Sequence, residues 1–376
     1  MKGLLKISLF FALGTVLLTG CSSEPQEKNT IRFASLEKKA LADFPDERIE
    51  SRTFIKFDST DPEFLFNDVD NVKIQNGRVY LLFWHRHNDT RLLVFDMQGK
   101  GVMALARTGL GPEEYYQISD FDVDQSGNIH IIDGNRDELI VYGPEGNFIS
   151  RKKLPYEVDD IRCLPSGDYL FVLCNWNTGR CAGRKVILAA PDLSVKKEYF
   201  RYGENLDLNF ILSSNVFTGT TAGFAAFNES LNDNIYIFDQ TGSLTDSLRI
   251  DFGSRTIPED EKSDVEKNIL RNEAYTCLSG HNTIVNDYVA GNMYSGHAFS
   301  YLIDRTNDII YSDFNKKYAD AFSLILGAAD DGRIISYIRP EMFGQEKPTH
   351  IPDDVIEHVE DDNFALCITK LRAPKI

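Results

Sequence analysis

Residues 126–149 read SGNIHIIDGNRDELIVYGPEGNFI, and their pattern decides the fold. A turn at Gly127 precedes the apolar stretch IHII, a polar loop follows, and the second apolar stretch LIVY ends at another turn around Gly146. Short β-branched and aromatic stretches bounded by glycine and aspartate are typical of antiparallel strands joined by tight turns. This segment therefore predicts a small unit of consecutive β-strands.

The same pattern recurs along the chain. Two segments align closely with the first, and the later copies are looser: residues 76–100 and 166–194, then 222–244, 282–308 and 331–341, the last completed by 362–371. Six copies at a period of about 40 to 60 residues, with four strands each, are typical of propeller blades. The sequence predicts an all-β, six-bladed β-propeller with four-stranded antiparallel blades.

The propeller is predicted to fill residues 49–376 as a single domain. The segment SRTFIKFDS (51–59) precedes the first full copy and is expected to supply the outer strand of the last blade. A closing strand of this kind removes sheet edges that would otherwise invite aggregation.

The second copy resembles an NHL repeat almost position by position. The resemblance runs from Gly109-x-Gly111-Pro112 through FDVD (121–124) and NIHIID (128–133) to Gly146. From about residue 50 onward the chain is similar to the six-bladed, NHL-like or TolB-like propeller lipoproteins of Bacteroidota. This resemblance implies the fold but no particular reaction, because the family shares none.

The N-terminus has the layout of a secretory signal. Lys2 and Lys6 precede an apolar run, and Leu-Thr-Gly then leads to Cys21. Residues 1–20 are predicted to be a signal peptide. The Cys21 context resembles a bacterial lipobox, which implies cleavage before Cys21 and its acylation. Residues 21–48 are then expected to form a tether to the outer membrane, on its periplasmic or cell-surface side.

The charge of the chain limits its partners. The formal net charge is −17, and it becomes −19 when the signal peptide with its two lysines is removed. Such a field disfavours nucleic acid, and contact with the membrane is expected only through the lipid. A monomer is the expected state.

Cysteines and inserts add two expectations. Five cysteines remain beside Cys21, and either Cys174 and Cys181 form a bridge across the tip of a hairpin or all five are buried thiols. Two inserts are expected to be short helices: 256–276 as one amphipathic helix, and 351–362 as a shorter one.

The stretch GPEEYYQISD (111–120) has a counterpart in DPEFLFNDVD (61–70), at the offset of the turn glycines. Both are therefore predicted to be crossovers from the outer strand of one blade to the inner strand of the next. Gly109 and Gly111 are expected to supply positive φ values there. A phosphate-binding loop is disfavoured, because it would need a helix start and no acids after the glycines.

Asp70, Asp120 and Asp160 each lie seven residues before a turn glycine, at the start of a predicted inner strand. Their carboxylates are expected near one mouth of the central channel. Two interpretations are open: the side chains accept backbone N–H groups and hold the crossovers, or they bind a hard cation such as Ca²⁺. No other cofactor is predicted.

The loops between the second and third strands of each blade share one end of the propeller with the crossovers. Aromatic, amide and charged side chains in these loops and in the crossover at 111–120 are predicted to bind a ligand: His85, Arg86, His87, Glu113, Tyr115, Asn135, Arg136, Trp176 and Arg180.

The favoured function is a noncatalytic binding module for a peptide, a protein or a glycan. The sequence has no nucleophile elbow, no Cys-x-x-Cys motif and no His-Glu-x-x-His motif. One alternative is a metal-dependent hydrolase or lyase with its site at the channel mouth. Another is a structural component of the cell envelope that docks a partner through its rim helices.

Overall fold

The structure is a computed structural model. It describes residues 29–37, 44–58, 60–85, 89–203, 207, 216–270, 272–312, 324–338 and 350–372.

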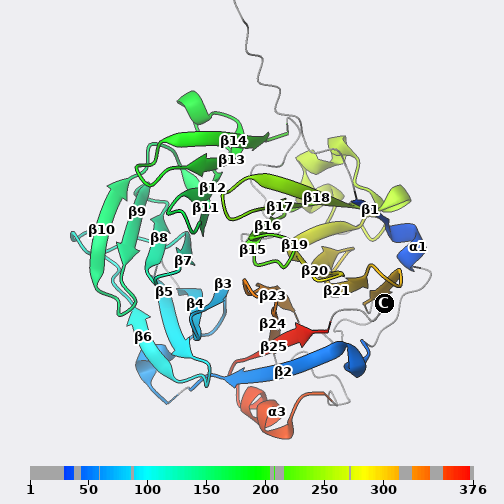
Figure 1. Cartoon of the computed structure of the whole chain (residues 1–376), viewed down its shortest axis with the longest axis horizontal. Coiled ribbons are helices and arrows are strands. Elements are labelled where there is room, and N and C mark those ends of the chain that lie inside the picture. The colour runs from blue at the N-terminus through cyan, green and yellow to red at the C-terminus, as the bar shows by residue number, and fades with distance from the viewer. Residues whose placement is uncertain are drawn as a thin grey trace, which may run out of the picture.

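Six sheets surround a central axis, as Figure 1 shows, which confirms the six-bladed propeller. Blade 1 contains strands β3 (Asn71–Gln75), β4 (Arg78–His85), β5 (Asp89–Asp96) and β6 (Gly101–Leu105). Blade 2 contains β7 (Asp120–Val123), β8 (Ile129–Asp133), β9 (Glu138–Tyr142) and β10 (Phe148–Lys153). Blade 3 contains β11 (Val158–Cys163), β12 (Tyr169–Leu173), β13 (Arg184–Ala189) and β14 (Val195–Arg201). Blade 4 contains β15 (Phe217–Thr218), β16 (Ala225–Phe227), β17 (Asn234–Phe238) and β18 (Leu244–Asp251). Blade 5 contains β19 (Cys277–Val285), β20 (Tyr288–Tyr294), β21 (Ala298–Asp304) and β22 (Ile309–Tyr311). Blade 6 contains β23 (Ile325–Ala328), β24 (Ile334–Ile338), β25 (Ala365–Leu371) and β2 (Ile49–Lys56).

A repeated aspartate turn explains why the strands begin and end where they do. Asp124 Oδ1 accepts hydrogen bonds from the N–H groups of Ser126 and Asn128, at 2.8 and 2.9 Å. Asp96 and Asp239 make the equivalent pair of bonds in their own turns. The glycine three residues after each aspartate has a positive φ, which side chains with a Cβ rarely adopt. The Asp-x-x-Gly pattern therefore marks a turn in which the aspartate side chain binds backbone N–H groups and the glycine supplies the positive φ.

The ring is closed by pairing the two ends of the chain. β2 runs antiparallel to β25 and forms the outer strand of the last blade, as predicted from residues 51–59. In Figure 1 the blue β2 lies beside the red β25.

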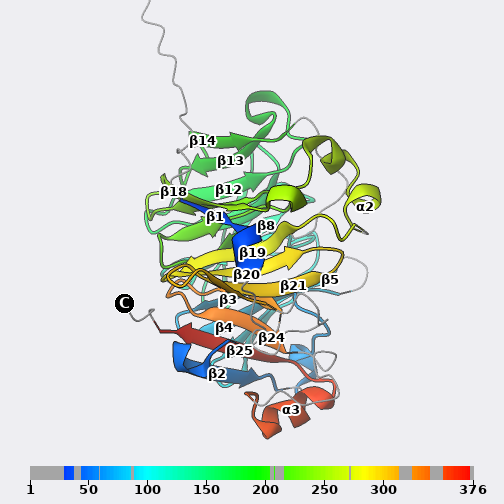
Figure 2. The same cartoon turned by 90° about the vertical axis from the view of Figure 1, so that its right-hand side faces the viewer.

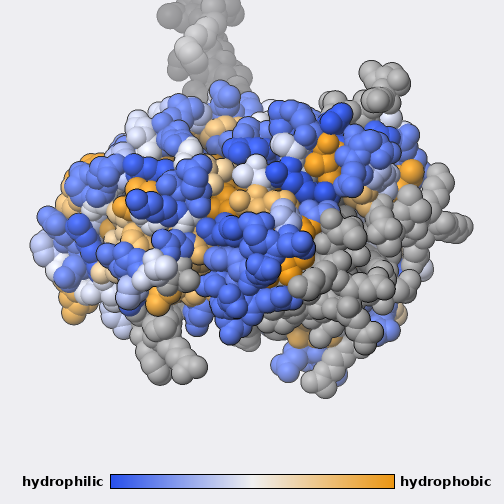
Figure 3. All heavy atoms as spheres, turned by 90° about the horizontal axis from the view of Figure 1, so that it is seen from below, coloured by the Kyte–Doolittle hydropathy of each residue, from blue (hydrophilic) through white to orange (hydrophobic). Residues whose placement is uncertain are grey.

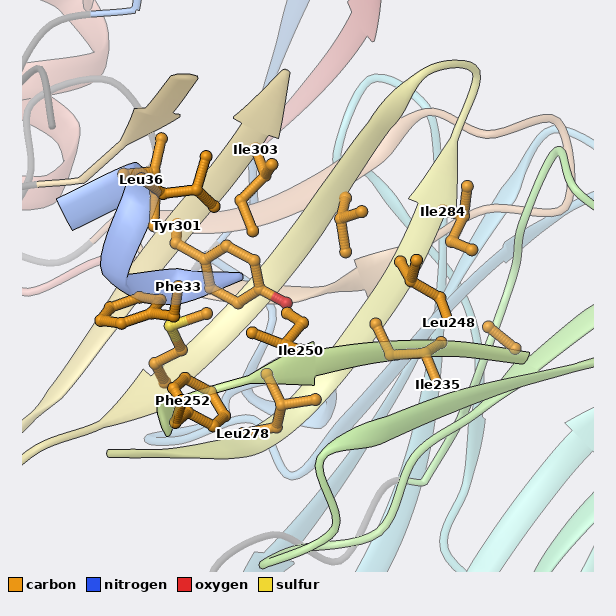
Figure 4. Packing of buried hydrophobic residues seen from close by; sticks show 14 of the residues in the cluster. Phe33, Leu36, Ile235, Leu248, Ile250, Phe252, Leu278, Ile284, Tyr301 and Ile303 are labelled. Carbon is orange, nitrogen blue, oxygen red and sulfur yellow. The ribbon is translucent and has the colours of Figure 1, made fainter. Parts of the chain in front are cut away.

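A second N-terminal segment crosses two further blades. β1 (Asn29–Arg32) adds to blade 4 as a fifth strand, parallel to β18, and α1 (Phe33–Glu37) follows it. Phe33 and Leu36 are buried, and the Phe33 ring lies 5.1 Å from that of Phe252. Figure 4 shows both side chains within the cluster formed by blades 4 and 5.

The same segment continues over blade 5 before it enters blade 6. The Phe44 ring lies 4.9 Å from the Tyr311 ring and 5.9 Å from the Tyr288 ring. The tether predicted for residues 21–48 is therefore too long, because apolar side chains at positions 33, 36 and 44 are part of the core. We call residues 29–48 the strap, and Figure 2 shows its first part in blue on the side of the molecule.

The two predicted helices turn out differently. The insert 351–362 forms α3 (Asp353–Glu360), which buries Val355, Ile356 and Val359 against β2 and β25. On the side that carries α3 and β2, the described surface is largely hydrophilic, with small apolar areas between polar ones (Figure 3).

The insert 256–276 is not one helix, so that prediction was wrong. It follows directly after a short 3-10 turn, η4 (Gly253–Arg255). It contains a second 3-10 turn, η5 (Glu259–Ser263), and a single α-helical turn, α2 (Val265–Asn268). The Asp264 side chain accepts from Lys267 N–H and starts a new helix after η5. The bend between them lets Ile257 join Val265 and Ile269 in one cluster.

All five cysteines of the described chain are buried free thiols, so the bridge between Cys174 and Cys181 is not formed. Among the described residues no helix combines the length and the apolar character needed to cross a bilayer.

The strap should be removable by local unfolding. Phe33→Ala removes a buried ring, a change that typically costs about 3–5 kcal/mol. Because the described contacts of the strap lie on blades 4 to 6, we expect faster amide exchange in β1 and unchanged exchange in blades 1 to 3. Hydrogen exchange measured by mass spectrometry checks this, with Ala34→Ser at an exposed neighbouring position as the control. Equal acceleration in every blade would contradict a separate strap.

Candidate functional site

The central channel is nearly filled. The cavity along it has a volume of about 20 Å³ and is lined by side chains of the inner strands and of the β23–β24 turn: Asn71, Lys73, Gln75, Arg162, Thr218, His281 and Asp330 among them. A space of this size holds about one water molecule. This cavity is therefore too small for an organic substrate.

A chain of charged groups fills the channel. Lys73 Nζ lies 3.0 Å from Asp122 Oδ1, and Arg162 Nη1 lies 3.3 Å from the same oxygen. Arg162 also pairs with Asp330 in the β23–β24 turn, and its guanidinium lies 4.7 Å from the centre of the Phe224 ring. One arginine thus joins blades 2, 3, 4 and 6 at the end opposite the crossovers.

The ion pairs among Asp122, Lys73 and Arg162 determine the protonation state of each of these side chains. Burial alone would raise the pKa of Asp122, but Lys73 and Arg162 hold it below its usual value. Burial alone would likewise lower the pKa of Lys73, but Asp122 and Asp120 raise it. Asp122, Lys73 and Arg162 are therefore all charged at neutral pH and satisfy one another.

Two of the three predicted channel-mouth aspartates, Asp120 and Asp160, are buried and lie close enough for Asp120 to raise the pKa of Asp160. Asp120 is buried and accepts from Asn71 Nδ2 (2.7 Å) and from the Ile161 N–H (2.9 Å). Asp160 is buried and accepts from the Val216 N–H (3.1 Å). Asp70 lies just before β3 and is exposed.

This arrangement favours the structural interpretation over the cation site. Burial and the neighbouring Asp120 raise the pKa of Asp160. In the described part of the chain no three His, Cys, Asp or Glu side chains are grouped to hold a metal ion. Ca²⁺ binding by Asp70, Asp120 and Asp160 gains no support from the geometry.

His281 was missed by sequence reasoning. It lies on the inner strand β19, lines the channel and has a positive φ of 55°. Burial lowers its pKa to about 4, so the ring is neutral at neutral pH. The irregular pairing of β19 with β20 around Gly280 hides the strand from a search for alternating residues.

Two expectations for the crossover at residues 106–119 need correction. Tyr115 is fully buried and cannot contact a ligand: its hydroxyl lies 2.8 Å from the carbonyl oxygens of both Thr90 and Leu105. Gly109 and Gly111 do not have positive φ values. A Cβ at Gly109 would lie 2.0 Å from the carboxylate of Glu114, so that carboxylate would have to move away from the Gly111 N–H, from which it accepts at 2.7 Å.

We call the end of the propeller that carries the crossovers and the loops between second and third strands the crossover face. Trp176, Asn135, Glu113 and Arg180 are exposed on it, as predicted. Most are already held by a neighbour: Trp176 Nε1 donates to the Glu157 carboxylate, Asn135 Nδ2 donates to Gln117 Oε1 (2.6 Å), and Glu113 lies 3.5 Å from Arg107.

The remaining predicted residues contribute less to this face. Arg136 is partly buried and lies 3.1 Å from Glu138. His85 ends β4, and only its backbone is described. Arg86 and His87 lie outside the described residues.

Three exposed apolar residues on the crossover face, Leu65, Leu110 and Tyr116, were not predicted. Among the large apolar side chains that the described chain leaves exposed, four lie on this face: Leu65 (48%), Leu110 (78%), Tyr116 (38%) and Trp176 (61%). The other two, Val102 and Ile149, lie on the outer strands β6 and β10. An apolar residue inside a Gly-x-Gly loop, as at Leu110, was the available signal.

The carboxylate of Asp159 lies at the mouth of the channel on the same face. It is accessible to solvent, yet the surrounding protein excludes much of the bulk water, and this burial with the nearby Asp120 raises its pKa to about 6. At pH 7 it adds a negative charge two residues after Glu157.

A family model, a domain of unknown function called DUF4934, matches residues 34–370. The chain belongs to the DUF4934 family. No curated protein matches its sequence.

Solved structures share the fold of this DUF4934 protein. A predicted exported protein of Bacteroides fragilis is 16% identical, with a TM-score of 0.70 over 91% of this chain and 99% of that one. A DUF4221 family member from Bacteroides vulgatus is 9% identical, with a TM-score of 0.51 over 87% of this chain and 98% of that one. At these identities the similarity shows the propeller fold alone, and the NHL repeat and the lipid anchor stay predictions.

Arg162 should be the most costly single charge to remove. Arg162→Met leaves Asp122 with one cation and Asp330 with none, and breaking a buried pair in this way typically costs about 3–5 kcal/mol. We expect that loss in the free energy of unfolding, measured by urea denaturation. Arg184→Met, which removes a half-exposed pair with Glu198 (2.7 Å), is the control and should cost less than about 1 kcal/mol. Similar losses for both variants would contradict the role of Arg162.

Proposed function

We propose that this DUF4934 protein is a noncatalytic, lipid-anchored binding module of the outer membrane, and that its crossover face recognises a polypeptide. The observation that carries the proposal is the concentration of exposed Leu65, Leu110, Tyr116 and Trp176 on that face. Exposed apolar side chains set among polar ones are typical of protein interaction sites.

The loops that carry these side chains are held in place before any ligand binds. The Asn177 side chain donates to the carbonyls of Glu157 and Cys174 and accepts from the Glu157 N–H, which fixes the loop of Trp176. The buried Tyr115 hydroxyl does the same for the loop of Leu110 and Tyr116. Preorganised loops lower the entropy that binding must offset.

A polypeptide fits this face better than a glycan. Sugars stack on flat aromatic rings, but two of the four exposed apolar residues are leucines, which pack against other aliphatic or aromatic side chains. An enzyme would need an open channel mouth, whereas the channel holds about one water molecule and the Asp120 and Asp160 carboxylates accept backbone N–H groups.

Changes on the crossover face should abolish binding and leave the fold intact. A photo-reactive amino acid at the exposed Thr178 should form crosslinks to a polypeptide in intact cells, and Leu110→Ser or Trp176→Ala should remove them. Truncation of a central anchor typically costs about 2 kcal/mol or more of binding free energy. Ile149→Ser, on the outer strand β10, is the matched control and should leave the crosslinks unchanged. Crosslinks that survive both changes on the crossover face would refute the proposal.

The lipid anchor rests on the signal-like N-terminus and on Cys21. Because β1 begins at Asn29, residues 22–28 span at most about 25 Å, so an acylated Cys21 would keep blade 4 close to the membrane. A second role, as a structural envelope component, would instead use the insert 256–276, whose deletion would leave crosslinking from Thr178 unchanged.

The anchor can be tested without knowledge of the ligand. Cells grown with an alkyne-labelled fatty acid should label the wild-type protein, which should partition into detergent and fractionate with the outer membrane. Cys21→Ser should remove the label and the partitioning. Unlabelled wild-type protein would exclude lipidation.

A further inference from the structure

The charges of the crossover face identify the kind of polypeptide that it would bind. The crossover that leads into blade 1 contains only acidic charges within residues 57–70: Asp58, Asp61, Glu63, Asp68 and Asp70, all exposed. Of these, Asp61 and Glu63 form no ion pair with any other described residue. Leu65, one of the exposed apolar residues, lies in the middle of this acidic segment.

Several cations of the same face are already occupied. Arg107 lies 3.5 Å from Glu113 and over the Tyr142 ring, and Arg136 is paired with Glu138. Arg151 donates to the Glu114 carbonyl. These pairings leave a surplus of negative charge for a ligand to meet.

The protein itself shows how this face holds a cation. The Lys185 ammonium group is paired with the Glu229 carboxylate and lies 4.9 Å from the centre of the Tyr202 ring. A carboxylate on one side and a ring face on the other stabilise an ammonium group through charge and cation–π attraction.

A second pair of an aromatic ring and a carboxylate lies in the next loop without such a cation. Trp176 donates its Nε1–H to the Glu157 carboxylate and leaves 61% of its surface exposed. The loop that carries Trp176 is fixed by Asn177, as described above, so the ring is presented rather than free to turn away. Asp159 lies on the same strand entry, two residues after Glu157.

We infer that Trp176, Glu157 and Asp159 bind the ammonium or guanidinium group of a lysine or arginine, and that the ligand is a basic polypeptide segment with apolar neighbours. The segment places its apolar side chains on Leu110, Tyr116 and Leu65, and its other basic groups face the acidic crossover at 57–70. This inference rests on the proposed binding role of the crossover face and specifies its ligand.

The electrostatics of the whole chain act in the same direction. A formal charge of −17 attracts a cationic segment from a distance, and the attraction weakens with salt. The apolar contacts do not weaken in the same way, so binding should be salt-sensitive but not abolished.

The test uses the full-length mature protein in detergent and three synthetic peptides of equal length. Each peptide contains the same leucines and tyrosines, and its charged positions are lysine and arginine, glutamine, or glutamate. The chain has two tryptophans, so a Trp84→Phe background makes the fluorescence report on Trp176. We expect the basic peptide to change this fluorescence on binding, the neutral peptide to bind at least about tenfold more weakly and the acidic one not at all.

Variants then separate charge from shape. Glu157→Gln keeps an oxygen for the Trp176 Nε1–H but loses the negative charge. Asp159→Asn removes the negative charge at the channel mouth with little change in side-chain size. Each should weaken the basic peptide by about tenfold while the neutral peptide is unaffected. Trp176→Leu, followed by calorimetry, should weaken it by about threefold to thirtyfold. Glu145→Gln, an exposed acid in a turn at the opposite end, is the control and should change nothing.

The outcomes distinguish this inference from the proposed function. Equal binding of the basic and acidic peptides, or an unchanged affinity in Glu157→Gln, would overturn the inference even if crosslinks from Thr178 persist. If the wild-type protein forms no crosslinks from Thr178 and binds none of the three peptides, both the inference and the proposed function are overturned.

Discussion

The pairing of Arg162 with Asp122 and Asp330 is the interaction on which the rest of the structure depends. A propeller must bring six inner strands around an axis, and their polar edges must be satisfied without bulk water. The Arg162 ion pairs connect blades 2, 3 and 6, and its contact with the Phe224 ring adds blade 4. The inner strands can then approach until only about 20 Å³ is left between them.

Closure of the ring has a second, peripheral part. The pairing of β2 with β25 joins the ends of the chain, and the strap extends the closure by packing Phe33 and Phe44 on blades 4 and 5. Under the proposed acylation of Cys21, a pull on the N-terminus would act first at β1. Since β1 pairs in parallel along β18, that pull is shared by a row of hydrogen bonds and a buried cluster before it reaches the closing strand.

The sequence predicts the blades where local turn chemistry sets them, and fails where distant contacts do. Asp124 and Gly127 define their turn within five residues, so blades 1 to 3 are visible in the sequence. The strap is not, because Phe33 is buried by Phe252, far along the chain. Equivalent spacing also misplaced Asp70: Asn71, one residue later, is the side chain that bonds to Asp120. Tyr115 looked like a rim residue because a pattern of loop residues does not reveal which ring turns inward.

A filled channel has a consequence for where function can reside. In a propeller whose axis is open, the inner strands can present a site to a substrate. Here Lys73, Asp122 and Arg162 of the inner strands form ion pairs with one another, and burial keeps His281 neutral. The opposite end of the axis is closed by Arg162 and Asp330, whereas the crossover face carries four exposed large apolar side chains together with exposed acidic residues. The same charge pairing that stabilises the axis therefore supports the proposal that recognition occurs at the rim, where loops held by Tyr115 and Asn177 can vary in sequence without disturbing the blades.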